Sequence, residues 1–87
     1  MVNQRLNIRL KYECQCNVHL ANSSYYAMTK NISSSGVLVH FPDPLPDVQV
    51  GDRCILSLNR GPLLRYDSEV ARVEESNIAF RLLSAAL

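Results

Sequence analysis

Hydrophobic and polar residues alternate along much of the chain, and this alternation predicts β-strands. The clearest case is residues 12–20, where every second residue shares one apolar face: Tyr12, Cys14, Cys16, Val18 and Leu20. The positions between them are polar, as in a strand that turns one face to a core and the other to solvent. His19 falls on the polar face, and we expect its ring to be solvated.

Five further segments read as strands, each bounded by turn-forming residues. They cover residues 25–30, 37–41, 53–59, 64–73 and 78–82. The connection over 42–52 is rich in proline and ends in a Gly-Asp turn, so we expect it on the surface. Residues 83–87 follow the last strand and are enough for about one helical turn.

Six short strands, with turns roughly every 8–12 residues and no convincing helix, predict an all-β fold, either an antiparallel barrel or a sandwich. A chain of 87 residues buries only a modest share of its surface, so its stability is marginal. A closed barrel would help because closure leaves few strand edges with unpaired backbone groups. Nothing in the composition divides the chain, so we expect one domain over residues 1–87. Within it, residues 1–10 would form an N-terminal arm and residues 11–83 the barrel.

Composition and charge indicate which kinds of molecule the chain could bind. The chain is 47% hydrophobic with a formal net charge of +1, which argues against bulk electrostatic binding to DNA, RNA or an anionic membrane. The charge is unevenly spread: residues 1–40 carry four basic side chains and one acidic, whereas residues 41–87 carry five arginines and seven acids. This favours a small anionic ligand bound by the N-terminal half.

The cysteines and histidines give little reason to expect catalysis. Cys14, Cys16 and Cys54 lack the C-x-x-C spacing of metal or redox sites and are most simply buried thiols in a reducing compartment. His40 has no partner nucleophile or carboxylate in its pattern, so we interpret it as structural. We therefore predict no enzyme activity, no metal and no cofactor.

The sequence shows no apolar run near the roughly 20 residues that span a bilayer. The first residues also do not lead into the apolar stretch of a signal peptide. We expect a cytoplasmic protein without membrane insertion.

Two short motifs carry the candidate chemistry. Arg5 and Arg9 are four residues apart, which in an extended chain puts both guanidinium groups on one face, about 13 Å apart at ~3.3 Å per residue. Guanidinium makes forked hydrogen bonds to phosphate and reads the O6/N7 edge of guanine. The second motif, Asn-Ile-Ser-Ser-Ser-Gly at residues 31–36, predicts a tight turn with clustered donors, in which Gly36 supplies left-handed backbone angles. Alone it is an ordinary turn; with the arginines it describes a clamp for an anionic guanine nucleotide.

The pair of motifs resembles the RxxxR and (D/N)xSxxG motifs of PilZ domains, bacterial receptors for cyclic di-GMP. The likeness extends to Gly51-Asp52, to the strand at residues 69–73 and to residues 78–80, so it covers nearly the whole chain. It implies a six-stranded antiparallel split barrel with the ligand on its outer surface, between arm and turn. The resemblance also implies that Arg5 and Arg9 bind the phosphates and a guanine of the dinucleotide.

The resemblance assigns the other guanine and its sugar to Asn31, Ser33 and the backbone of Gly36, with Gln4, Ser34 and Ser35 in supporting roles. Three departures are visible. Gln4 stands where another basic residue can precede the first arginine, which leaves open whether one or two dinucleotides bind. Ala79 replaces a usual glycine, and the family's C-terminal helix is nearly absent, which leaves a barrel edge open or covered by a partner.

Three functions remain in competition. The first is a cyclic di-GMP receptor that signals to a protein partner through ordering of its arm. The second is a PilZ-like interaction adaptor that does not bind nucleotide. The third is a single-stranded nucleic-acid binder, which would need stacking aromatics in a basic groove and is disfavoured by the absence of Trp and the near-neutral charge.

Overall fold

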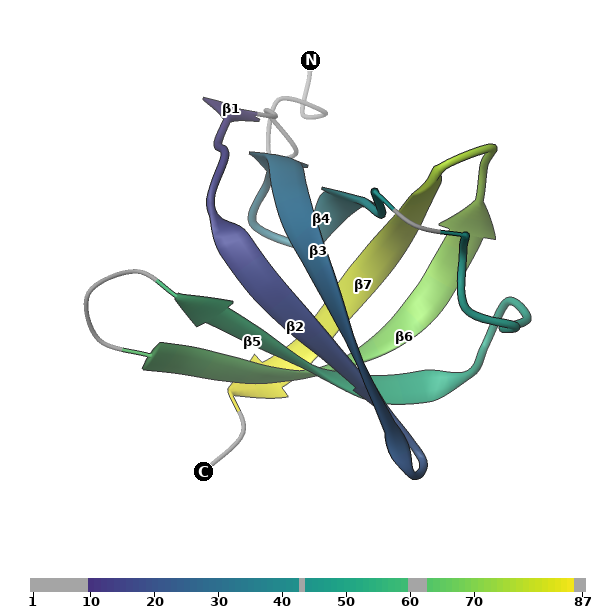
Figure 1. Cartoon of the computed structure of the whole chain (residues 1–87). Helices are drawn as coiled ribbons and strands as arrows, with labels where there is room; N and C mark the ends of the chain where they lie inside the picture. The colour runs from purple at the N-terminus through teal and green to yellow at the C-terminus, as the bar shows by residue number, and fades with distance from the viewer. Residues whose placement is uncertain (1–9, 43, 60–62, 86–87) are drawn as a thin grey trace, which may run out of the picture.

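The computed structural model describes residues 10–42, 44–59 and 63–85, and in this part the chain consists of β-strands and connections, without a helix (Figure 1). The strands are β1 Leu10–Lys11, β2 Gln15–Leu20, β3 Ser23–Ile32, β4 Gly36–His40, β5 Arg53–Asn59, β6 Leu63–Val73 and β7 Asn77–Ala85. Accordingly, no helix long and apolar enough to cross a membrane occurs among these residues.

Six of the strands close into an antiparallel barrel. Around the ring the order is β3, β2, β5, β6, β7 and β4, and β4 pairs back onto β3. The predicted six-stranded antiparallel barrel is therefore confirmed. The two-residue β1 is an addition: it lies beside the end of β3, with Leu10 opposite Ile32 and Lys11 opposite Asn31.

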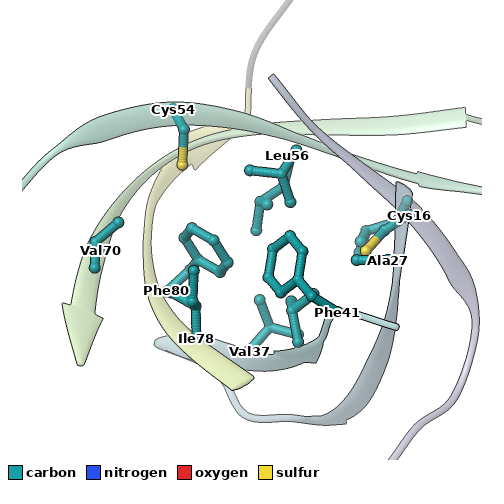
Figure 2. Close-up of a cluster of buried hydrophobic side chains, with 12 residues drawn as sticks. Cys16, Ala27, Val37, Phe41, Cys54, Leu56, Val70, Ile78 and Phe80 are labelled. Carbon is teal, nitrogen blue, oxygen red and sulfur yellow. The ribbon is translucent and has the colours of Figure 1, made fainter. Parts of the chain in front are cut away.

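The inward positions of the ring form one hydrophobic core. The alternation predicted this core well in β4 and β5, where Val37, Val39, Cys54, Leu56 and Leu58 are buried. Figure 2 shows the rings of Phe41 and Phe80 pointing into the interior from different segments of the chain.

The predicted strand at residues 12–20 is interrupted. β2 begins only at Gln15, because residues 12–14 lie opposite only two residues of β3 and form a β-bulge. The cause is the buried side chain of Thr29. Its Oγ1 donates to the carbonyl of Tyr12 at 2.7 Å and accepts from the amide of Cys14 at 2.9 Å, so a hydroxyl stands where a regular ladder would continue.

One other expectation is wrong. His19 is half-buried rather than freely solvated, with Nδ1 2.6 Å from Ser24 Oγ and Nε2 3.0 Å from Ser57 Oγ, a hydroxyl on a residue that is only 4% exposed. At the C-terminal end, residues 83–85 continue β7 and pair with β6 as far as Ala85, which agrees with the expectation of little or no C-terminal helix.

The two ends of the barrel differ. The connection after β4 covers the end near Leu20 and Tyr25, where Leu45 and Val48 pack against the core. Gly51, with a φ of 97°, makes the sharp turn that leads from this connection into β5, and its amide donates to the carbonyl of Val70 at 2.7 Å. At the opposite end lie β1, the end of β3 and the turn that follows it.

Candidate functional site

The Asn-Ile-Ser-Ser-Ser-Gly motif contains the predicted tight connection between β3 and β4, but this connection consists of residues 33–35 alone: Asn31 and Ile32 end β3, and Gly36 begins β4. Ser33 closes it. The Ser33 amide donates to the carbonyl of Gly36 at 2.8 Å, and Ser33 Oγ accepts from the amides of Gly36 at 3.2 Å and Ser35 at 3.4 Å. Two backbone amides of the turn therefore donate to the same oxygen, Ser33 Oγ, and these bonds fix the conformation of the loop.

Gly36 does not supply a left-handed angle, contrary to our expectation. It is the first residue of β4, buried and paired with Arg81 of β7, so its backbone is extended. Among the described residues, positive φ angles occur at Ala21 and Gly51.

The turn is also tied to β7. The amide of Leu82 donates to the carbonyl of Ser35 at 2.9 Å, which fixes the loop against the strand that follows Arg81. Ser34 and Ser35 have exposed side chains at the tip of the turn, and Asn31 is half-buried beside it. The result is a rigid rim of polar groups on the outer surface of the barrel.

Two basic side chains that the motifs do not include lie next to this rim. Lys11 is exposed and directly opposite Asn31, so the two side chains share a face. Arg81 is the cross-strand neighbour of Gly36, and its Nη1 lies 3.3 Å from Glu69 Oε1. Lys11 could have been predicted as a site residue, because it is two residues after Arg9 and would lie on the same face of an extended chain. Arg81 could not, because only its pairing with Gly36, far away in the sequence, places it beside the turn.

The remaining predicted site residues, Gln4, Arg5 and Arg9, lie outside the described residues. The structure shows where the chain that carries them joins the barrel. Leu10, the residue after Arg9, pairs with Ile32 inside the motif, so the N-terminal segment meets the barrel at the turn.

The chemistry of the described residues suits binding. No group of three or more His, Cys, Asp or Glu side chains among them is placed to hold a metal ion. Burial, and to a smaller extent the neighbouring Cys14, raises the pKa of Cys16 to about 12. Burial also raises the pKa of Cys54, although the hydrogen bond between its thiol and Ser68 Oγ opposes the rise. Both thiols are thus neutral core groups, not nucleophiles.

Comparison with known proteins agrees with this fold. The profile of the PilZ domain matches residues 3–86, and no curated protein matches the sequence. The crystal structure of the PilZ domain of CeSA from a cellulose-synthesizing bacterium is similar with a TM-score of 0.74 at 15% identity, over 87% of this chain and 80% of that one.

A second solved structure, the inhibitor of motility MotI/DgrA of Bacillus subtilis, is similar with a TM-score of 0.77 at 18% identity. The match covers 98% of this chain but 44% of that chain, so the present chain spans less than half the length of that protein. At these identities the two likenesses show a common fold.

Proposed function

Because this chain belongs to the PilZ domain family, we propose that it is a receptor for cyclic di-GMP that passes the level of this second messenger to a protein partner. PilZ domains are non-catalytic receptor domains, and the family typically binds cyclic di-GMP. The observation that carries the proposal for this chain is the pairing of Leu10 with Ile32. It joins the segment bearing Arg5 and Arg9 to the barrel at the turn that holds the second motif.

In this proposal the arginines supply most of the binding energy. Each charge-assisted hydrogen bond from Arg5 or Arg9 to phosphate or guanine contributes about 1.5–3 kcal/mol. Asn31 binds the other guanine through its amide. Ser33 keeps the turn in shape, and its hydroxyl proton, whose contact with the carbonyl of Gly36 is long at 3.4 Å, can turn toward the ligand.

The surroundings of the turn complement a dianion. Lys11 and Arg81 add positive charge beside the motif, with Arg81 partly neutralised by Glu69. Gln4, Ser34 and Ser35 act as supporting hydrogen-bonding groups. A dinucleotide held between arm and turn would order the arm against the barrel, and the partner would recognise this changed surface.

Calorimetric titration with cyclic di-GMP, cyclic di-AMP and GMP tests the proposal. We expect a clear preference for cyclic di-GMP and, in Arg9→Ala, an affinity lower by at least about tenfold, the equivalent of one lost charge-assisted bond. Arg65→Ala is the matched control, because Arg65 is exposed on β6 and lies opposite Ser57 of β5, across the ring from β3 and β4. Equal affinity for all three nucleotides, or an unchanged affinity in Arg9→Ala, would contradict the proposal. No binding by the wild type, with a protein partner still captured, would favour the adaptor function instead.

A further inference from the structure

A row of charged side chains crosses the outer surface of the barrel from β5 toward β4. Glu69 of β6 lies opposite Arg53 of β5 and, on its other side, opposite Arg81 of β7. Arg81 in turn lies opposite Gly36 of β4, the last residue of the candidate motif. Directly paired residues of antiparallel strands have Cα atoms about 4.5–5.5 Å apart and turn their side chains to the same face. One carboxylate is thus flanked by two arginines, and one of these is next to the candidate site.

The backbone of β7 fixes Arg81 beside the turn. In addition to the pairing of Arg81 with Gly36, the amide of the next residue, Leu82, donates to the carbonyl of Ser35 at 2.9 Å. Because Gly36 has no side chain, its position places none between Arg81 and the turn. Asn31 belongs to β3, which pairs with β4 on the other side. The strand β4 therefore has a motif amide side chain along one edge and a guanidinium along the other.

The ion pair between Arg81 and Glu69 is of a kind that exchanges readily. Arg81 Nη1 donates to Glu69 Oε1 over a long distance, 3.3 Å, and the two side chains are 58% and 24% exposed. Exposed pairs contribute little and are screened by salt, whereas guanidinium binds phosphate through forked, charge-assisted hydrogen bonds. Arg53 also stays opposite Glu69 when Arg81 leaves, so the carboxylate keeps a basic neighbour.

We propose that Arg81 is a further ligand-binding arginine of the nucleotide site and that Glu69 holds it back in the free protein. This inference rests on the proposed function and adds to it a pair of residues that sets the affinity. When a dinucleotide binds at the turn, the Arg81 guanidinium exchanges Glu69 for a phosphate oxygen. Glu69 therefore lowers the affinity, because the ion pair must break before Arg81 contributes.

Calorimetric titration with cyclic di-GMP gives the first test. Arg81→Ala should bind about tenfold more weakly, the equivalent of one lost charge-assisted bond. Glu69→Gln should bind about two- to fivefold more tightly, which is the range expected for breaking an exposed ion pair. Asp47→Asn is the matched control, because it removes the same charge from a pocket shared with Ala21 and Asn22, in the turn at the other end of β3. Its affinity should equal that of the wild type.

The double variant separates the release of Arg81 from simple repulsion between Glu69 and an anionic ligand. In the Arg81→Ala background, Glu69→Gln should change the affinity by less than about 1.5-fold, because no guanidinium is left to release. Repulsion at a distance would give the same gain or a larger one in this background, and that result would overturn the proposal. An unchanged affinity in Arg81→Ala alone would overturn it as well.

The Nε–Hε NMR signal of Arg81 gives a second readout that does not depend on affinity, and its absence in Arg81→Ala assigns it. In the free protein, Glu69→Gln should shift this signal, and cyclic di-GMP should shift it in the wild type. A signal that does not respond to bound nucleotide would contradict the exchange of partners.

The titrations also distinguish the two levels of the proposal. If the wild type and Glu69→Gln bind cyclic di-GMP with equal affinity, the inference about Arg81 and Glu69 fails while the proposed function stands. If neither protein binds the nucleotide, the proposed function fails and this inference fails with it.

Discussion

At the scale of single residues, the hydroxyls of small buried or half-buried side chains form structural hydrogen bonds that their sequence position does not reveal. Ser33 belongs to the motif that we propose binds the ligand, yet its hydroxyl accepts from two amides of its own turn. Ser68 is fully buried, and its hydroxyl donates to the carbonyl of Cys54 at 3.1 Å. Such hydroxyls satisfy backbone groups that would otherwise be costly to bury.

Cys16 gives a prediction about pH. Burial raises the pKa of its thiol from about 9 to about 12 in the folded chain. Between these values the unfolded chain loses the thiol proton while the folded chain keeps it, so the free energy of unfolding falls as pH rises. The contribution is fully present below pH 9 and falls by up to about 1.4 kcal/mol per pH unit above it.

Urea denaturation of the wild type and of Cys16→Val at a series of pH values from 8 to 11 measures this effect. Valine is neutral throughout, so the variant should lose stability with pH less steeply than the wild type. The same slope in both proteins would show that the Cys16 thiol ionises equally in the folded and unfolded chains.

At the scale of strands, the sequence predicts elements whose pattern is local and misses features that depend on distant partners. The alternation identified β4 and β5 and their inward faces. The bulge at residues 12–14 could not be seen in that pattern, because it depends on the side chain of Thr29 on the neighbouring strand. The burial of His19 likewise depends on Ser57, which is 38 residues away.

In the candidate site, too, the features encoded by local sequence were predicted and those that depend on distant partners were not. A turn within residues 31–36 follows from their composition, and the structure confirms a turn between two strands, although only residues 33–35 form it. The extended backbone of Gly36 and the proximity of Arg81 follow from the pairing of β4 with β7, which no local pattern encodes. The roles of Arg5 and Arg9 stay predictions.

Thr29 gives a prediction at this scale, because its hydroxyl determines where β2 begins and how the chain passes from β1 to β2. Thr29→Val keeps the shape of the side chain but leaves the amide of Cys14 and the carbonyl of Tyr12 without this partner. We expect a loss of about 1–3 kcal/mol in the free energy of unfolding. Chemical denaturation measures it.

Thr29→Ser is the matched control, since it keeps the hydroxyl and removes one methyl group, at a cost of about 0.5–1.5 kcal/mol. If Thr29→Val were as stable as the wild type, the bulge would not depend on the hydroxyl.

At the scale of the whole molecule, one small core supports the entire ring. A domain of this size has a free energy of unfolding at the low end of about 5–15 kcal/mol. Phe80 is 2% exposed and lies within that core, together with Phe41, Leu56 and Ile78. Every strand of the barrel therefore depends on the same few side chains.

Phe80→Ala should cost about 3–5 kcal/mol and remove most of the stability of the fold. Calorimetry should show a much lower melting temperature or no cooperative transition, while Phe80→Leu, which keeps more of the volume, should retain a cooperative melt at a moderately lower temperature. A Phe80→Ala variant that melts within a few degrees of the wild type would show that the core is not shared in this way.

Closure of the ring also sets an order of events during folding. The β2–β3 hairpin joins residues close in sequence, such as Leu20 and Ser23, and hairpins of this kind form in about 1–10 μs. The pairs Cys16 with Leu58 and Gly36 with Arg81 join distant parts of the chain, and folds rich in such pairs take milliseconds to seconds. The bond from Leu82 to Ser35 forms only when β7 reaches β4, so the turn acquires its final shape at the step that completes the ring. A nucleotide site that uses this turn, as in the proposed function, would therefore exist only in the finished barrel.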